Sequence, residues 1–167
     1  MTLGVTGAVL IAGEPFQRTV MAWLAHLLPS RRIAILTRWQ HLLVHFILRT
    51  TRTLGGAHIQ PPLAIPGEAG VLVLMNHQSV LDIPLVGAAL PIHLRIVTRG
   101  RYASGKPIIS HMVRLYQYPV VEPTATVPGR LRSIGEATQD SPIPIVFYPE
   151  GTRTRDGRLG SWREGGP

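Results

Sequence analysis

The 167-residue sequence contains no cysteine, which excludes disulfides, thiolate metal ligands and a cysteine nucleophile. Lysine is almost absent as well, since sixteen of the seventeen cationic residues are arginine. Acidic residues number only nine, so the formal net charge is +8. Charged residues make up 16% of the chain and hydrophobic residues 45%, and this composition excludes a disordered tail. A mean hydropathy of +0.18 beside a pI of about 11.2 favours an anionic membrane surface as the partner.

The cations are concentrated in the most apolar third of the chain. Residues 1–54 contain six arginines and a single acidic residue, Glu14, among many leucine, isoleucine, valine and alanine residues. Trp23 and Trp39 lie in the same stretch. No segment interleaves aromatic residues with cations in the way that stacks nucleic-acid bases. We therefore expect a lipid surface as the partner, and no nucleic acid.

Helical periodicity predicts two N-terminal helices, Glu14–Leu28 and Ser30–Leu54, joined at Pro29-Ser30. The preceding apolar run, Leu3–Gly13, has no positive residues before it and is shorter than the ~20 residues of a membrane span. Three interpretations stay open. The pair lies in the headgroup region, or it packs on a core as ordinary amphipathic helices, or one longer stretch spans the membrane.

The sequence pattern changes after residue 54, and we place there the boundary between a membrane-associating segment (1–54) and a catalytic domain (55–167). Strands and helices alternate in the second part, which predicts an α/β fold with a layered sheet and flanking helices. The apolar run at residues 71–75 predicts a strand buried on both faces. The predicted strands are 71–75, 93–98, 120–121 and 143–147, and the predicted helices are 79–90, 110–116 and 130–138.

A histidine and an aspartate follow the first strand, in the string NHQSVLD at residues 76–82. Five residues of regular helix place two side chains about 140° apart, so His77 and Asp82 meet only if His77 lies on the turn before the helix. Asp82 would then accept from one ring nitrogen and leave the other free as a general base. The alternative is a capping aspartate beside a buried histidine. Because Ser79 lies at the expected helix cap, we expect direct attack by a substrate hydroxyl.

The string FYPEGTR at residues 147–153 follows the last predicted strand. Its proline and glycine predict a tight turn that exposes backbone N–H groups to an anion. Thr152 adds a hydroxyl donor, and Arg153 adds a planar guanidinium suited to phosphate. Taken alone, the string also fits a basic surface loop. Together, the two strings predict a base and an anion cradle at one edge of a sheet.

NHQSVLD (76–82) and FYPEGTRT (147–154), about seventy residues apart, resemble the paired motifs of the glycerolipid acyltransferases. The resemblance is to the 1-acylglycerol-3-phosphate (lysophosphatidic acid) acyltransferases in particular, and it extends from about Gly55 to Glu164. The predicted helical pair is similar to the membrane-resting helices of that family. The resemblance therefore implies a peripheral enzyme on the cytoplasmic face of the inner membrane.

The resemblance also implies a mechanism. His77 would take the proton of the 2-hydroxyl of 1-acylglycerol 3-phosphate (lysophosphatidic acid), with Asp82 orienting the imidazole. The hydroxyl would attack the thioester of an acyl-CoA or an acyl-carrier protein, giving phosphatidic acid and a thiol. Arg153 would contact the acceptor phosphate. The residues that match the family's acceptor-binding loop are Glu150, Gly151, Thr152 and Arg153.

Two features depart from the family's pattern. The segment PVVEP at residues 119–123 lacks an arginine that the family carries between its motifs, and Arg130 or Arg132 would have to replace it. The chain also ends soon after the second motif, so we expect the C-terminal part of the fold to be missing. Another acceptor, such as glycerol 3-phosphate or a different lyso-lipid, therefore stays open. So does a non-catalytic, membrane-binding remnant.

Seven histidines raise a metal site as a further alternative. His41 and His45 are one helical turn apart, but no third ligand lies near them in the sequence. The membrane-helix interpretation accounts for both without a metal. We expect neither a metal nor another cofactor.

Overall fold

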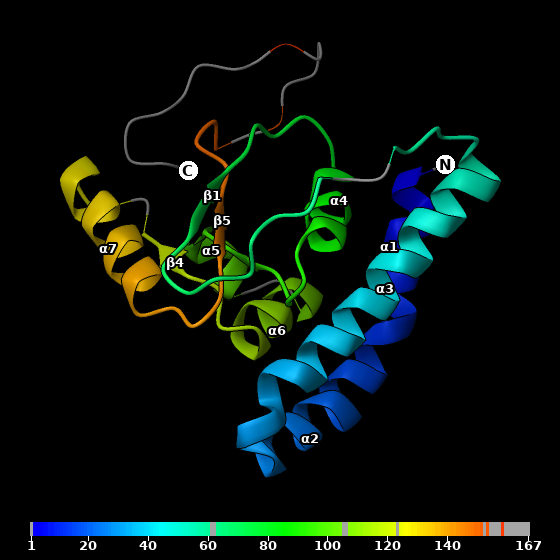
Figure 1. Cartoon of the computed structure of the whole chain (residues 1–167), viewed down its shortest axis with the longest axis horizontal. Coiled ribbons are helices and arrows are strands. Elements are labelled where there is room, and N and C mark those ends of the chain that lie inside the picture. The colour runs from blue at the N-terminus through cyan, green and yellow to red at the C-terminus, as the bar shows by residue number, and fades with distance from the viewer. Residues whose placement is uncertain are drawn as a thin grey trace. The chain divides into compact units, whose positions relative to one another are not determined.

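A computed structural model describes residues 2–60, 63–104, 107–122, 124–151, 153 and 158 (Figure 1). These residues form two compact units, one of residues 1–66 and 83–93 and the other of residues 67–82 and 94–167. Helices alternate with short parallel strands, which confirms the predicted mixture of helix and sheet in its coarse form. The elements in chain order are α1 (Thr2–Phe16), η1 (Gln17–Met21), α2 (Ala22–Leu27), η2 (Pro29–Arg31), α3 (Arg32–Gly55), β1 (Leu72–Leu74), α4 (Asp82–Ala89), β2 (Arg95–Ile96), β3 (Thr98–Arg99), α5 (Gly100–Ala103), α6 (Pro107–Leu115), β4 (Val120–Val121), α7 (Val127–Gln139) and β5 (Ile145–Phe147).

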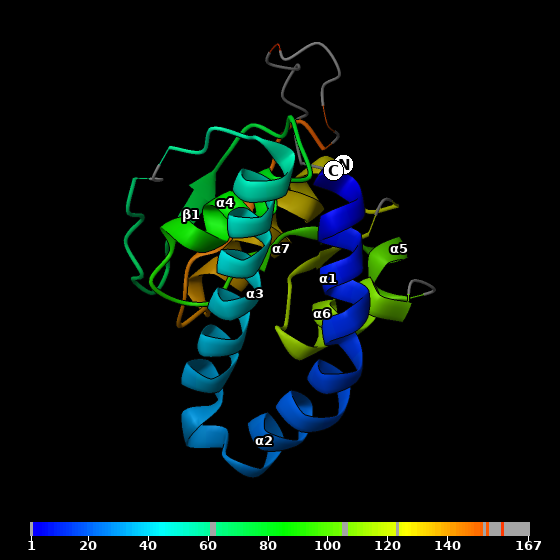
Figure 2. The ribbon, with the colours of Figure 1, turned by 90° about the vertical axis from the view of Figure 1, so that its right-hand side faces the viewer.

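The first unit is built on a helical hairpin, residues 2–55, in which α1 and α3 run antiparallel (Figure 2). The predicted break at Pro29-Ser30 is confirmed, since Leu28 leaves the helical conformation and Pro29 opens η2. The predicted start at Glu14 is wrong, because α1 begins at Thr2. A Cβ added at Gly13 would lie 3.3 Å from Leu43 Cδ2, so this glycine permits a close approach of α1 to α3. Packing thus overrides the low helix propensity of a glycine-containing run.

A buried polar chain fixes the register of the hairpin. Trp39 Nε1 donates to Gln17 Oε1 at 3.0 Å, and Gln17 Nε2 donates to Glu14 Oε2 at 3.3 Å. Arg18 Nη2 then donates to Glu14 Oε1 at 2.7 Å. Buried polar groups without partners are costly, so a shift of one helix along the other would be resisted at this point.

Large apolar side chains are exposed along the helical hairpin. They include Ile11, Phe16, Trp23, Leu27, Leu42 and Phe46. Across the described residues, no helix combines the length and the apolar character needed to cross a bilayer.

Helix α4 packs in the first unit, beside α3. A Cβ added at Gly87 would lie 3.1 Å from Val44 Cγ2, and the Ala89 carbonyl accepts from the Ile65 N–H at 2.9 Å. The sequence predicts that this helix begins at residue 79, but in the structure it begins at Asp82. The Ser79 hydroxyl accepts from the Leu81 N–H at 3.2 Å and so caps the preceding turn.

The second unit contains a three-stranded parallel sheet in the order β1-β5-β2, with Val146 paired to both Val73 and Ile96. A second parallel pair joins β3 to β4. The predicted strand 93–98 is therefore divided between two sheets. The prediction that 71–75 is buried on both faces is also wrong, because β1 is an end strand in the described sheet and exposes Leu72 and Leu74.

Arg95 is the first residue of β2, the first part of the divided strand. Its Nη1 donates to the Ser141 hydroxyl at 2.7 Å and its Nε donates to the Gln117 carbonyl at 2.9 Å. Gln117 has a φ of +54°, which a non-glycine residue adopts only in a tight turn. Arg95 thus connects the turn after α6 to the turn before β5.

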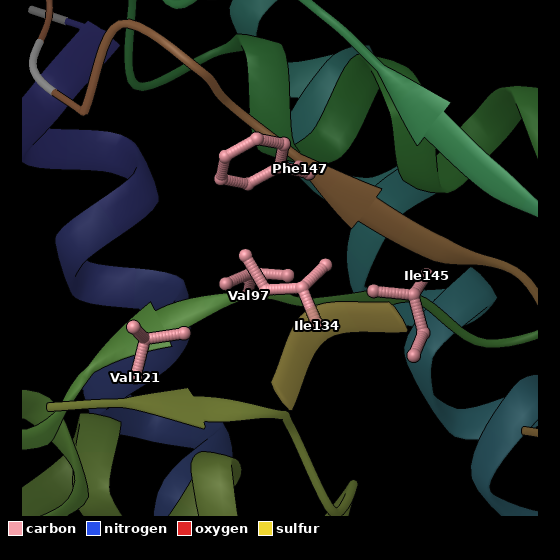
Figure 3. Close-up of a cluster of buried hydrophobic side chains, with 5 residues drawn as sticks. All are labelled: Val97, Val121, Ile134, Ile145 and Phe147. Atoms are coloured by element: carbon pink, nitrogen blue, oxygen red, sulfur yellow. The ribbon is translucent and has the colours of Figure 1, made fainter. Parts of the chain in front are cut away.

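The core of the second unit holds β5 in place. Five buried side chains from β5, α7, β4 and the β2–β3 junction pack together (Figure 3). Burying one such side chain is worth roughly 1.5–3 kcal/mol. The cluster consists of Val97, Val121, Ile134, Ile145 and Phe147.

Candidate active site

The two sequence motifs meet because β1 and β5 are parallel neighbours. The ladder continues one residue past the strands, where the Met75 N–H donates to the Phe147 carbonyl at 3.0 Å. The carboxyl ends of adjacent parallel strands lie at the same edge of a sheet. The residues after β1, beginning with Asn76, therefore lie beside the residues after β5, beginning with Tyr148.

His77 and Asp82 are in direct contact. His77 lies on the turn before α4 and Asp82 is the first residue of that helix, with 2.9 Å between His77 Nδ1 and Asp82 Oδ2. The same carboxylate oxygen accepts the N–H groups of Gln78 at 2.7 Å and Ser79 at 2.8 Å. One oxygen thus holds both the imidazole and the turn that carries it.

The hydrogen bonds decide the charge of Asp82. Partial burial alone would raise its pKa, but the hydrogen bonds from His77 and from the Ser79 and Gln78 N–H groups hold the pKa below its ordinary value of 3.8. Asp82 is therefore a carboxylate at neutral pH, and Nδ1 of a neutral His77 must carry the ring proton. Nε2 then has a free lone pair and can accept a proton from a substrate.

This lowered pKa predicts a loss of stability in acid. A carboxylate with a lower pKa in the folded than in the unfolded chain stabilises the fold above its unfolded pKa, and that contribution disappears as the pH falls through the folded pKa. We expect the free energy of unfolding to fall below about pH 3.8 more steeply in the wild type than in Asp82→Asn. Urea denaturation at several pH values measures both slopes, and equal slopes would contradict the assigned charge.

Glu150 faces inward. Its side chain is 2% exposed, and Oε1 accepts the backbone N–H of His77 at 3.1 Å. The 148–151 turn brings it there, because the Gly151 N–H donates to the Tyr148 carbonyl at 3.0 Å and Gly151 has a φ of +65°. Only glycine adopts that conformation readily. The sequence predicts a turn that exposes its backbone N–H groups, and in the structure the Gly151 N–H is used inside the turn.

Arg153 is exposed, and Thr152 lies outside the described residues. A cation that sequence analysis did not consider contacts the turn instead: Arg99 Nη2 donates to the Gly151 carbonyl at 2.9 Å. Arg99 is the last residue of β3, directly after the predicted strand 93–98. Its position directly after a predicted strand was the sequence feature that could have indicated this contact.

Tyr148 is the second residue that sequence analysis missed. Its ring centroid lies 4.4 Å from that of His77, with 30° between the ring planes. The side chain is 6% exposed, and among the described residues its hydroxyl has no hydrogen-bond partner. Burial raises the pKa of Tyr148, and the charge of Asp82 raises it further, so the hydroxyl stays protonated. The sequence feature that could have indicated Tyr148 is its position as an aromatic residue directly before Pro149, Glu150 and Gly151.

An imidazole whose Nδ1 contacts a carboxylate can, in general, deprotonate a hydroxyl through its other ring nitrogen. Residues 51–166, which include His77, Asp82 and the 148–151 turn, match the sequence profile of the family described as Acyltransferase. The match covers more than half of the chain, and the chain belongs to this acyltransferase family.

Among solved structures, the chain is similar to the 1-acyl-sn-glycerophosphate (LPA) acyltransferase PlsC from Thermotoga maritima, with 16% sequence identity and a TM-score of 0.45. The similarity covers 99% of this chain and 69% of that one. No protein with a curated description matches the chain.

Proposed function

We propose that the chain transfers a fatty acyl group from a thioester to the 2-hydroxyl of 1-acylglycerol 3-phosphate, giving phosphatidic acid. The thioester is an acyl-CoA or an acyl-carrier protein. The observation that carries the proposal is the 2.9 Å contact between His77 Nδ1 and Asp82 Oδ2, inside the range that matches the family. The resemblance of both motifs to the lysophosphatidic acid acyltransferases favours this acceptor.

In the proposed reaction, His77 Nε2 accepts the hydroxyl proton while the oxygen attacks the thioester carbon. The new C–O bond gives a tetrahedral oxyanion, and its collapse breaks the C–S bond and expels a thiolate. A thiol pKa near ~8.5 makes this a good leaving group. The thiolate takes the proton from the His77 imidazolium, which Asp82 has stabilised, and the base is restored.

The acceptor phosphate needs an accessible cation. Arg153 is exposed and follows the 148–151 turn, so we propose Arg153 for this contact, with Gly151 and Thr152 as parts of the same loop. The side chain of Glu150 is buried, and its Oε1 already accepts the His77 N–H, so it does not face an acceptor phosphate. We therefore propose that Glu150 holds the base in place and does not bind the acceptor.

The test is thiol release by the chain in lipid vesicles, from acyl-CoA and from acyl-carrier protein, with lysophosphatidic acid, with glycerol 3-phosphate, or with neither acceptor. Mass spectrometry identifies the lipid product. Release that depends on lysophosphatidic acid and yields phosphatidic acid supports the proposal. Release that depends instead on glycerol 3-phosphate would show that this compound is the acceptor. Vesicle binding without thiol release from either donor would favour a non-catalytic remnant.

We propose that the helical hairpin rests on the anionic lipid surface of the inner membrane, from its cytoplasmic side. Trp23 is 61% exposed and Leu42 is 60% exposed, in a segment whose charged residues are almost all arginines. Apolar side chains would enter the headgroup boundary while guanidinium groups contact lipid phosphates.

The double variant Trp23→Ser/Leu42→Ser should bind anionic vesicles at least about tenfold more weakly than the wild type, because each side chain contributes roughly 1.5–3 kcal/mol when buried. Co-sedimentation with phosphatidylglycerol vesicles measures the loss. Leu131→Ser is the control, since Leu131 is equally apolar and 50% exposed but lies on α7. An equal loss in both variants would show that the hairpin has no special part in binding.

A further inference from the structure

Tyr148 covers one face of the proposed catalytic base. The two ring centroids are 4.4 Å apart and the ring planes are inclined by 30°, so the imidazole packs against the phenol ring in a tilted arrangement. Both residues belong to the second unit, and β5 with the 148–151 turn supplies the tyrosine. The contact is therefore built into the sheet edge that forms the site.

We propose that Tyr148 is a positioning residue for His77: its ring keeps the imidazole in the plane that places Nδ1 on Asp82, and its π face stabilises the imidazolium formed during the reaction. The proposal rests on the proposed role of His77 as general base. It concerns a residue that none of the motif arguments used.

The other two contacts of His77 do not fix the plane of its ring. Asp82 fixes one atom of the ring, Nδ1, and Glu150 fixes the backbone N–H. Neither contact prevents the ring plane from swinging about the Nδ1 hydrogen bond. A flat aromatic neighbour restricts that swing, because it packs closely against only one orientation of the imidazole.

The ring also acts through its charge distribution. The face of an aromatic ring is electronegative and attracts a cation that lies over it. Among the described residues of the second unit, Asp82 contacts the His77 ring and Glu150 contacts its backbone N–H, while Arg99 contacts the carbonyl of Gly151 in the neighbouring turn. Tyr148 adds attraction for the protonated ring without adding a charge, so the base becomes a better proton acceptor.

The hydroxyl of Tyr148 has no part in this role. It is buried, and it finds no hydrogen-bond partner in the described part of the chain. Phenylalanine should therefore replace tyrosine with little loss, whereas an aliphatic residue should not. Phe147 provides the matched control, because it is a neighbouring buried aromatic residue whose ring packs in the hydrophobic cluster (Figure 3).

The experiment compares Tyr148→Leu, Tyr148→Met, Tyr148→Phe and Phe147→Leu in the whole chain. We expect the Leu and Met variants to lose about tenfold in kcat, with unchanged KM for donor and acceptor and with the acid limb of the pH–rate profile moved to lower pH. Tyr148→Phe should stay within about twofold of the wild type. NMR of the His77 ring, assigned by its loss in His77→Ala, should show the same displacement of the titration midpoint.

The NMR arm needs no turnover, so the two proposals are tested separately. Midpoints that move as expected in a chain without transferase activity would support the contact with His77 while refuting the proposed function. A wild-type midpoint and wild-type kcat in both aliphatic variants would overturn the role of Tyr148. An equal loss in Tyr148→Phe would overturn it too, because the hydroxyl would then be responsible. Met retains the bulk of the side chain, which keeps the test open if the Leu variant fails to fold.

Discussion

Replacing Asp82 by asparagine should lower kcat only about 10- to 100-fold, whereas Asp82→Ala and His77→Ala should each lower it by about 1,000-fold or more. The difference arises from the geometry of Asp82. A single oxygen, Oδ2, accepts from His77 Nδ1 and from the N–H groups of Gln78 and Ser79. An asparagine must keep its carbonyl oxygen at that position, because its NH₂ group would otherwise face two backbone donors.

The tautomer of His77 should therefore survive in Asp82→Asn. In catalytic triads the same substitution is far more damaging, because the amide donates to the imidazole and forces the wrong tautomer. Here the two backbone N–H groups select the orientation of the amide, and only the negative charge is lost. The missing charge weakens the stabilisation of the imidazolium, which accounts for the smaller expected loss.

Initial rates of acceptor-dependent thiol release measure the series, and His58→Ala serves as the control because His58 is an exposed histidine of the first unit. Near-normal activity of His77→Ala would refute the assignment of the base. Equal losses in Asp82→Asn and Asp82→Ala would show that the amide does flip. In that case the NMR spectrum of His77 would report the proton on Nε2.

The contact between His77 and Asp82 could be predicted from the sequence because the two residues are close together along the chain. A histidine before a helix and an aspartate on its first turn are placed by five residues of chain, and the strand that precedes them was visible as an apolar run. The meeting of the two motifs was predictable for a similar reason. Each motif follows an apolar strand, and parallel strands present their carboxyl ends together.

The contacts missed by sequence analysis depend on packing between distant segments. Strand 93–98 is divided where the Val97 N–H donates to the Val146 carbonyl and the Thr98 N–H donates to the Pro119 carbonyl, two partners in different distant segments. The inward direction of Glu150 depends on a hydrogen bond across 73 residues. In the hairpin, Gly13 of α1 packs closely against Leu43 of α3, a contact that no local propensity reveals.

Glu150→Ala should lower kcat about 100-fold and leave the KM for the acceptor unchanged. The substitution removes the oxygen that accepts the His77 N–H at 3.1 Å, so the turn that carries the base loses a fixed point. A displacement of about 1 Å in a catalytic group is enough for a loss of this size. The partly buried N–H group also loses its partner, which should lower the free energy of unfolding by about 1 kcal/mol.

The split between kcat and KM distinguishes this role from the one implied by the family resemblance. A glutamate that binds the acceptor would change KM when removed, whereas a glutamate that positions the base changes kcat. Glu150→Gln keeps an oxygen acceptor and should recover most of the activity. Glu136→Ala, an exposed glutamate on α7, is the control for loss of charge. A raised acceptor KM with normal kcat in Glu150→Ala would return Glu150 to the acceptor site. The buried side chain of Glu150 would then have to turn outward to reach the acceptor.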